Sequence, residues 1–376
     1  MKTAEQHITE VLESGPRIII AGGGTGGHIF PAVAVANALK DLNKNISILF
    51  IGANGKMEME KVPQAGYNIS GIDISGFDRG SMLKNVTLPF KIIRSFFQVR
   101  SILNAFKPDA VFGVGGYSSY PVLRLAQLLN IKTFLHESNA FAGKSNKLLA
   151  KKAVKVFVAV EGMEKFFPAK RIMITGNPVR SNIAHNTVDT IKAKHSFGLE
   201  EENITVFAMG GSLGARSINE AIDEGLDRIL NSNLQLIWQT GKLYTERAKE
   251  ITENKKGVWA NDFITGMENA YAAADIVVSR SGAMSVSELC ISGKPVVFVP
   301  YPFAAEDHQS ANAKALVQKS AAIMIKDSEA KLKLVDEVLA LASDPERRLT
   351  LASNIRKLAV KDADYQIAKT ILENIA

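Results

Sequence analysis

The sequence lacks the features that mark secreted, membrane-spanning and disulfide-stapled proteins. Its 376 residues contain one cysteine, Cys290, so a disulfide framework is excluded and a reducing compartment is favoured. No apolar run approaches the length that crosses a bilayer, and residues 1–16 lack the apolar core of a secretory signal. We therefore expect a cytoplasmic protein with a flexible N-terminal lead over residues 1–16.

Several catalytic motifs are also missing. There is no HExxH sequence and no cluster of cysteine and histidine, so we predict that the protein needs no metal. A Gly-x-Ser-x-Gly elbow is absent, which argues against a serine hydrolase. No Walker lysine follows either of the glycine-rich stretches described below, which argues against an ATPase.

The composition fits a soluble globular protein of two domains. The chain is longer than one hydrophobic core usually serves, and its 46% apolar and 22% charged residues are ordinary values. The net charge of +7 is unevenly spread, because the first half is basic and the second half slightly acidic. An anionic partner is therefore expected on the first half.

One glycine-rich stretch organises the first half. The apolar segment Ile18–Ala21 runs into residues 22–27, where five of six positions are glycine, and then into His28 and a helix-like segment. This pattern indicates a strand, a loop and a helix, and the loop could be a phosphate cradle, a catalytic corner or only a tight turn. Its spacing matches the dinucleotide fingerprint, but the second strand ends at 50–54 without the acid that binds a ribose. Nicotinamide chemistry is therefore disfavoured.

The same pattern restarts in the second half, where an apolar segment runs into Gly210–Arg216. Alternating strand-like and helix-like segments predict parallel sheets covered by helices on both faces. We predict an α/β protein of two Rossmann-like, doubly wound domains that face a cleft, over residues 17–177 and 178–376, with a last helix that can pack back on the first domain. Strands are predicted at 18–21, 46–51, 110–114, 133–135, 154–160, 172–174, 204–209, 234–238, 275–279, 295–299 and 322–325.

Candidate site residues follow the strand ends. The second glycine loop offers amides and the Ser212 hydroxyl for a diphosphate, although a plain turn would have the same pattern. A helix expected from Ala283 presents further amides, and Glu288 could accept hydrogen bonds from a ribose or be a solvated acid. Further polar clusters lie at 113–117, 136–139 and 306–309, where a sheet would hold them at the cleft.

The segment 81–107 departs from this pattern. It is densely apolar, carries basic residues and contains no acid, and Pro89 should break or kink a helix there. Such a segment could lie on an anionic membrane surface, or it could be a core helix with a solvated basic face. The residues assigned to a membrane surface are Lys91, Arg94, Phe97 and Arg100.

Seven ordered motifs resemble those of the MurG family of N-acetylglucosaminyltransferases. They are GGGTGGHIFPAVAVA at 22–36, GVGGY at 113–117, HESN at 136–139, GNPVR at 176–180, GGSLGAR at 210–216, RSGAMSVSE at 280–288 and DHQSANA at 307–313. The resemblance covers nearly the whole chain from Arg17 onward, and departs from the family at Tyr120, Ser138 and Leu213. It implies a glycosyltransferase-B fold, UDP-N-acetylglucosamine as donor substrate, lipid I as acceptor, lipid II as product, and no cofactor.

The resemblance also implies roles for individual residues. The donor diphosphate would contact Ser212, Arg180 would help to bind the donor, and the backbone of Ile264 would meet uracil. Glu288 would bind the ribose, while Gln309 and Asn139 would recognise the sugar. The remaining donor-site residues are Thr25, Gly26 and Gly27 of the first loop and Ala283, Met284, Ser285, Val286 and Ser287 of the later helix. On the acceptor side we expect Tyr117, His136 and Glu137.

An inverting transfer needs a base for the acceptor hydroxyl, and His28 is the candidate because imidazole can be neutral near pH 7. The alternative is that His28 only holds the loop. The expected location is the cytoplasmic face of the cell membrane, peripherally on an anionic inner-membrane surface and without nucleic acid. Two alternatives remain: another glycosyltransferase-B protein, such as a UDP-sugar epimerase, and a nucleotide-sugar binding protein without turnover.

Overall fold

The computed structural model describes residues 15–75, 88–211, 213–304 and 307–375, with the side chains of 88–90 left out. The chain forms two compact units, one made of Met1–Arg180 and Asp362–Ala376 and the other of Ser181–Lys361. The sequence had placed the division after residue 177, whereas the structure divides the chain after Arg180. Most of the expected N-terminal lead lies outside the described residues, and the first strand begins at Arg17.

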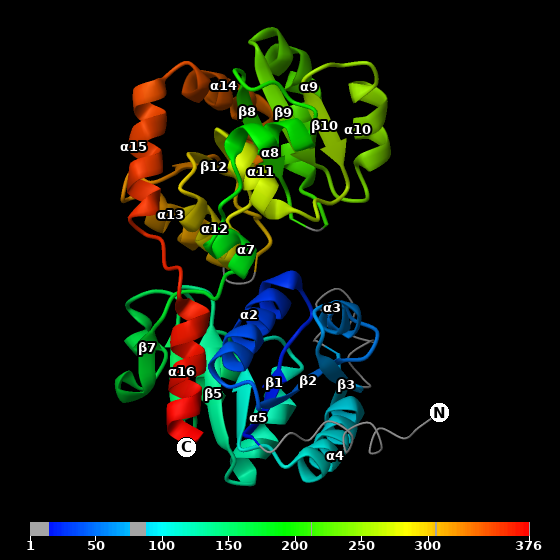
Figure 1. Cartoon of the computed structure of the whole chain (residues 1–376), viewed down its shortest axis with the longest axis vertical. Helices are drawn as coiled ribbons and strands as arrows, with labels where there is room; N and C mark the ends of the chain where they lie inside the picture. Colours follow the sequence, from blue (N-terminus) through cyan, green and yellow to red (C-terminus); the bar gives the residue numbers. More distant parts are fainter. Residues whose placement is uncertain (1–14, 76–87, 212, 305–306, 376) are drawn as a thin grey trace. The chain divides into compact units, whose positions relative to one another are not determined.

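The first unit is built on a parallel sheet of seven strands in the order β3-β2-β1-β4-β5-β6-β7 (Figure 1). The strands are β1 Arg17–Ala21, β2 Ser47–Ala53, β3 Asn68–Ile72, β4 Ala110–Gly113, β5 Lys132–Glu137, β6 Lys155–Val158 and β7 Ile172–Ile174. Its helices are α2 Gly26–Leu42, α3 Glu58–Gln64, α4 Leu88–Phe106, α5 Ser119–Leu128, α6 Lys144–Leu149 and α16 Ala363–Ile375, with short 3-10 turns at Met163–Lys165 and Ala169–Arg171.

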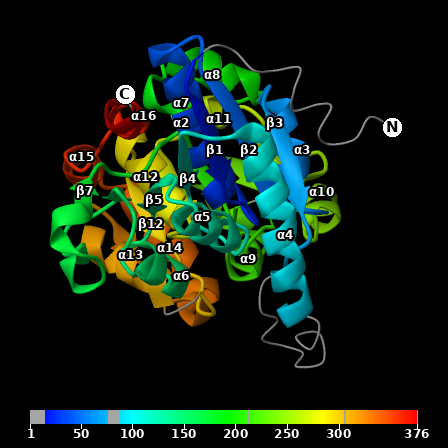
Figure 2. The same cartoon turned by 90° about the horizontal axis from the view of Figure 1, so that it is seen from below.

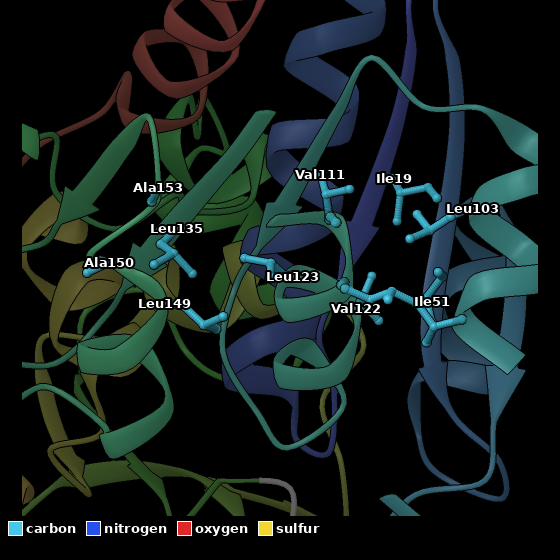
Figure 3. Close-up of a cluster of buried hydrophobic side chains, with 14 of the residues drawn as sticks. Ile19, Ile51, Leu103, Val111, Val122, Leu123, Leu135, Leu149, Ala150 and Ala153 are labelled. Carbon is cyan, nitrogen blue, oxygen red and sulfur yellow. The ribbon is translucent and has the colours of Figure 1, made fainter. Parts of the chain in front are cut away.

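Both faces of this sheet are buried, as the continuous apolar runs of its strands require. Alternate residues of β1 point to opposite faces, because side chains of a strand alternate. Ile19 packs with Val111 and Leu135 beneath α4, α5 and α6 (Figure 3). Ile18 and Ile20 pack on the other face.

Helix α16 belongs to the core of the first unit. It lies beside α2 (Figure 1), and its Ile367, Ala368 and Ile371 are fully buried in the same cluster as Ile18 and Ile20. The last residues of the chain therefore complete the hydrophobic core of the unit that contains the first strand.

Helix α4 covers one edge of the first sheet, where it packs against α5 and β3 (Figure 2). Pro89 lies in its first turn, a position that tolerates proline, so the helix runs on through Phe106 without the break expected from the sequence. Val99, Leu103 and Phe106 face the core, while Ile93 and Phe97 are 57% and 71% exposed.

The second unit repeats the topology with six parallel strands in the order β10-β9-β8-β11-β12-β13. The strands are β8 Ile204–Met209, β9 Leu234–Gln239, β10 Val258–Asn261, β11 Ile276–Ser279, β12 Val296–Phe298 and β13 Ile323–Met324. Its helices are α7 Ser181–Ala184, α8 Thr190–Ser196, α9 Arg216–Asn231, α10 Thr245–Thr252, α11 Met267–Ala273, α12 Ala283–Ser292, α13 His308–Val317, α14 Ala330–Ala342 and α15 Pro345–Arg356, with a 3-10 turn at Asp327–Glu329.

Counted within each unit, both sheets have the strand order 3-2-1-4-5-6 that defines the Rossmann fold, and the first sheet adds a seventh strand. The order reverses between β1 and β4 and again between β8 and β11. Ligands of such sheets bind beyond the carboxyl ends of the strands at this reversal. Both glycine loops predicted from the sequence follow a strand at this point.

Candidate active site

In the first unit, the loop after β1 carries His28 on the first turn of α2. The imidazole Nδ1 lies 3.1 Å from the carbonyl oxygen of Gly23. A carbonyl oxygen can only accept, so Nδ1 donates and carries the proton. The other ring nitrogen, Nε2, lies against the loop after β4, where a Cβ on Gly115 would come within 3.0 Å of it. Nε2 is therefore the nitrogen that can accept a proton.

The surroundings of His28 favour its neutral form. Burial lowers the pKa of His28 below its usual value of 6.5, and the charges of Glu137 and Glu58 partly oppose that shift. Neither carboxylate is hydrogen-bonded to the ring, whose Nδ1 partner is the Gly23 carbonyl. A neutral imidazole at pH 7 has the protonation state of a general base.

The structure places His136 and Glu137 inside the first unit. His136 is fully buried at the end of β5, and burial lowers its pKa to about 4. Glu137 is 5% exposed and accepts hydrogen bonds from the Gly143 amide at 3.1 Å and the Asn146 side chain at 2.9 Å. Its other oxygen accepts from the Asn139 amide at 3.2 Å. These contacts hold the loop 138–143, and an acceptor-contacting role for these two residues stays a prediction.

The other first-unit candidates are more accessible. Thr25 is the exposed N-cap of α2, and Gly26 and Gly27 form the first residues of that helix. Tyr117 is half-buried beside Gly24, and burial raises its pKa. The guanidinium of Arg180 lies over the Phe30 ring, 4.8 Å from its centroid. Tyr117 and Phe30 therefore lie beside the glycine loop, and Arg180 stacks on Phe30.

In the second unit, the loop after β8 is held from behind by a neutral side chain. Gln239, 4% exposed at the end of β9, donates from Nε2 to the carbonyl oxygen of Gly211 at 3.1 Å. The Gly214 amide donates to the same carbonyl at 3.0 Å. Ser212, the predicted diphosphate contact, lies outside the described residues.

The predicted ribose acid has a buried partner that the sequence did not reveal. The hydroxyl of Tyr271, 1% exposed on α11, donates to Glu288 Oε2 at 3.0 Å. Glu288 lies on α12, whose half-buried residues 283–287 form the helix start after β11. The first amides of a helix have no partner within it, so this start can receive an anion.

The remaining second-unit candidates occupy the same edge of the sheet. Ile264 is buried in the loop after β10. Gln309, near the start of α13, accepts from the Tyr301 amide at 2.9 Å through its side chain and from Ser281 through its carbonyl. Arg280, for which no role was predicted, donates to the carbonyls of Val299 and Pro300 and pairs with Asp327. These bonds tie the loops after β11 and β12 together.

Among residues 15–75, 88–211, 213–304 and 307–375, no group of three or more His, Cys, Asp or Glu side chains could hold a metal ion.

Two doubly wound units, each with a glycine loop at the strand reversal, define the glycosyltransferase-B class of fold. Comparison with protein families gives the same class. Residues 18–158 match the glycosyltransferase family 28 N-terminal domain, and residues 205–367 match the corresponding C-terminal domain. The chain belongs to glycosyltransferase family 28 and, within it, to the MurG family.

Two relatives match this chain over nearly its whole length. A protein of Phocaeicola vulgatus is 48% identical over 365 residues, covering 96% of this chain and 97% of its own length. One of Parabacteroides distasonis is 49% identical, with 96% and 98% covered. Both are named UDP-N-acetylglucosamine–N-acetylmuramyl-(pentapeptide) pyrophosphoryl-undecaprenol N-acetylglucosamine transferase.

Solved structures agree on the fold. The crystal structure of Acinetobacter baumannii MurG superposes with a TM-score of 0.75 at 28% identity, covering 96% of this chain and all of the other. A UDP-GlcNAc 2-epimerase from Neisseria meningitidis superposes at 0.67 with 15% identity, over 96% of this chain and all of the other. At that identity the likeness concerns the fold alone.

Proposed function

We propose that this protein is an inverting glycosyltransferase that moves N-acetylglucosamine from UDP-N-acetylglucosamine to lipid I, forming lipid II for peptidoglycan synthesis. The observation that carries the proposal is 48% identity over 96% of the chain to a relative named for that transfer. The geometry of each unit supplies the chemical groups that such a reaction needs.

The proposal assigns the donor to the second unit. The loop 210–214 and the start of α12 supply backbone amides for the diphosphate, and Glu288 supplies a carboxylate for the ribose. By family resemblance, Ile264 would meet uracil and Gln309 the sugar. Arg180 and Asn139 of the first unit would add contacts to the donor. These amides and the arginine would offset the charge that develops on departing UDP.

The acceptor and the catalytic base belong to the first unit in this proposal. His28 Nε2 accepts the proton of the acceptor hydroxyl while that oxygen forms a bond to the anomeric carbon. The bond from this carbon to the diphosphate breaks, and UDP leaves with the bonding electrons. The Nδ1 hydrogen bond to Gly23 keeps the lone pair on Nε2 before the transfer, and the charges of Glu137 and Glu58 favour the imidazolium afterwards.

We further propose that α4 docks the enzyme on the cytoplasmic face of an anionic membrane. Ile93 and Phe97, one helical turn apart, are exposed beside Lys91, Arg94 and Arg100, so apolar and basic groups share one surface of the helix. Arg94 also pairs with Asp73 at 3.1 Å. None of the described helices combines the length and apolarity of a membrane span.

The transfer is tested by incubating the purified protein with labelled UDP-N-acetylglucosamine and a soluble lipid I analogue. Formation of the labelled disaccharide product is expected. Formation of an epimerised UDP-sugar without any disaccharide would indicate an epimerase. Binding of the donor without any product would indicate a binding protein. Either result would contradict the proposal.

The docking surface is tested by co-sedimentation with vesicles of phosphatidylglycerol and phosphatidylcholine. Reversing the charges of Lys91, Arg94 and Arg100 together should reduce binding strongly, since each basic residue near an anionic surface contributes about 1 kcal/mol. Reversing Lys249, Lys255 and Lys331 together, three basic residues of the second unit, is the matched control. Equal binding by both variants would leave α4 as a core helix with a solvated basic face.

A further inference from the structure

Strand β2 ends without an acidic residue, but a carboxylate from the following helix, α3, lies against its end. Glu58, the first residue of α3, is 1% exposed. Its Oε1 accepts from the Ala53 amide at the end of β2 at 3.0 Å, and its Oε2 accepts from the Gly24 amide at 2.8 Å. One buried carboxylate therefore joins the end of β2 to the glycine loop after β1.

The neighbouring glycines make room for this carboxylate. A Cβ on Gly23 would lie 2.2 Å from Glu58 Oε1, and a Cβ on Gly52 would lie 2.5 Å from Glu58 Cγ. Both distances are far below van der Waals contact, so neither position accepts a larger residue while Glu58 stays in place. Two of the glycines in this region are thus required by a side chain, in addition to any requirement of a substrate.

The peptide unit between Gly23 and Gly24 links Glu58 to the imidazole. Its amide hydrogen, on Gly24, is held by Glu58, and its carbonyl oxygen, on Gly23, is held by His28 Nδ1. Because an amide is planar, fixing its N–H also fixes the direction of its C=O. The orientation of the carbonyl that selects the His28 tautomer therefore depends on Glu58.

We propose that Glu58 is a positioning residue for the transfer reaction, which acts through the Gly23–Gly24 peptide to hold His28 with its proton on Nδ1 and its lone pair on Nε2. This inference rests on the proposed function for its kinetic consequence. The positioning itself is a property of the first unit and is testable without turnover.

Three titratable groups act on His28 from the elements around it. They are Glu58 from α3, Glu137 from β5 and the buried His136 from β5. Replacing Glu58 by glutamine removes one negative charge and leaves Glu137 in place. It also sets an NH2 group against one of the two backbone amides, so one of the two hydrogen bonds is lost.

The test compares Glu58→Gln with Glu60→Gln, a matched change at an exposed position of the same helix. With a lipid I analogue, Glu58→Gln should lower kcat about 10- to 100-fold with the KM for UDP-N-acetylglucosamine unchanged, since a hydrogen bond to a charged group is lost on the acceptor side only. The acidic limb of the kcat profile should move to lower pH, because a negative charge that raises the pKa of His28 is lost. Glu60→Gln should match the wild type.

A second readout is independent of activity. In protein labelled with 15N-histidine, the wild-type His28 ring should show Nδ1 protonated, and Glu58→Gln should shift it toward a mixture of tautomers. A kcat within about twofold of the Glu60→Gln variant, or an unmoved pH limb together with an unchanged tautomer, would overturn the positioning role. If the wild type formed no disaccharide, the proposed function would fail, and the tautomer would still decide the role of Glu58.

A further variant covers the case in which Glu58→Gln does not fold. Gly23→Ala keeps every polar group and should lower kcat by pressing on the carboxylate. Glu58→Asp shortens that side chain, so Gly23→Ala combined with Glu58→Asp should lose less activity than the product of the two single losses. Simple multiplication of the two losses would show that Gly23 and Glu58 act separately and would contradict the proposal.

Discussion

The two glycine loops occupy the same place in two sheets of the same strand order, and they differ in what lies behind them. Behind the first loop is the carboxylate of Glu58, which takes up the Gly24 amide. Behind the second is the neutral amide of Gln239, which donates to the Gly211 carbonyl. A buried negative charge repels phosphate and takes up a loop amide, whereas the bond from Gln239 takes up a carbonyl and no amide.

The same fold therefore carries two glycine loops with different chemical surroundings. The first loop presents a histidine oriented by a carbonyl. The second loop follows Met209, whose Sδ lies 3.9 Å from the hydroxyl of Tyr271 in the Tyr271–Glu288 pair. The buried group behind each loop, more than the glycine pattern itself, distinguishes the loop proposed to carry the base from the loop proposed to bind the diphosphate. The predictions below test this distinction.

The largest effect is expected from His28→Ala. Loss of a general base lowers turnover about 10²- to 10⁴-fold, so kcat at saturating donor should fall by that factor. Binding of UDP, measured by calorimetry, should stay at the wild-type value because the donor is assigned to the other unit. His195→Ala, at an exposed position of the second unit, is the control. Near wild-type turnover in His28→Ala would show that His28 is not the base, and the proposed chemical difference between the two loops would then be wrong.

Acid should destabilise the first unit through His136. Its pKa of about 4 lies below the value of 6.5 in an unfolded chain, so between these values only the unfolded state binds the proton. The stabilisation present above pH 6.5 is lost as the pH falls toward 4, by about 3 kcal/mol in total.

The measurement can separate the units because both tryptophans, Trp238 and Trp259, lie in the second unit. In urea titrations at pH 7, 5 and 4, far-UV circular dichroism reports both units and tryptophan fluorescence reports the second. The circular dichroism signal should weaken at lower urea concentrations than those at which the fluorescence changes. His136→Gln should flatten the pH dependence of the circular dichroism transition. Coincident transitions at every pH in both proteins would argue against this assignment.

A buried negative charge behind the second glycine loop, like that of Glu58 behind the first, should weaken donor binding. Gln239→Glu places a carboxylate behind the loop 210–214 and removes the donor to Gly211. We expect the Kd for UDP to rise about 10- to 30-fold, as for loss of a hydrogen bond plus charge repulsion. Gln318→Glu, at an exposed position of the same unit, is the control. Unchanged affinity in a folded Gln239→Glu protein would contradict the comparison.

The smallest effect is expected from Tyr271→Phe, which removes the hydroxyl that orients Glu288. The KM for UDP-N-acetylglucosamine should rise about fivefold with kcat little changed, because one neutral donor to a carboxylate is lost. The same change in a Glu288→Gln background should add much less. Tyr365→Phe is the control, and full additivity would indicate that Tyr271 acts only through packing.

Much of the fold could be predicted because its strands are buried on both faces. Of the thirteen strands in the part of the chain that the structure describes, eleven follow apolar runs that the sequence displays. The two that were missed, β3 and β10, occupy one edge of each sheet and are mostly half-buried, so their residues NISGI and VWAN carry no continuous apolar signal. Edge strands need less apolar surface, and sequence periodicity weakens accordingly.

The loops and helix starts that carry the candidate site were predictable where a motif precedes a helix, as at the starts of α2 and α12, while the roles of their residues stay predictions. Glu58 and Tyr271 were missed because their roles depend on contacts across 34 and 17 residues, which no local spacing encodes. Glu137 shows that a residue at a strand end can be buried and hold a loop, and the acceptor-side role of His136 and Glu137 stays a prediction.

The return of α16 to the first unit has a consequence for synthesis on the ribosome. The first unit cannot complete its core until Ile367, Ala368 and Ile371 have been translated and released. At about 5–20 residues per second, the roughly 180 residues of the second unit delay that step by about 10–40 s. The nascent N-terminal sheet would be exposed to chaperones during that interval, while the second unit, which is continuous in sequence, is free to fold first.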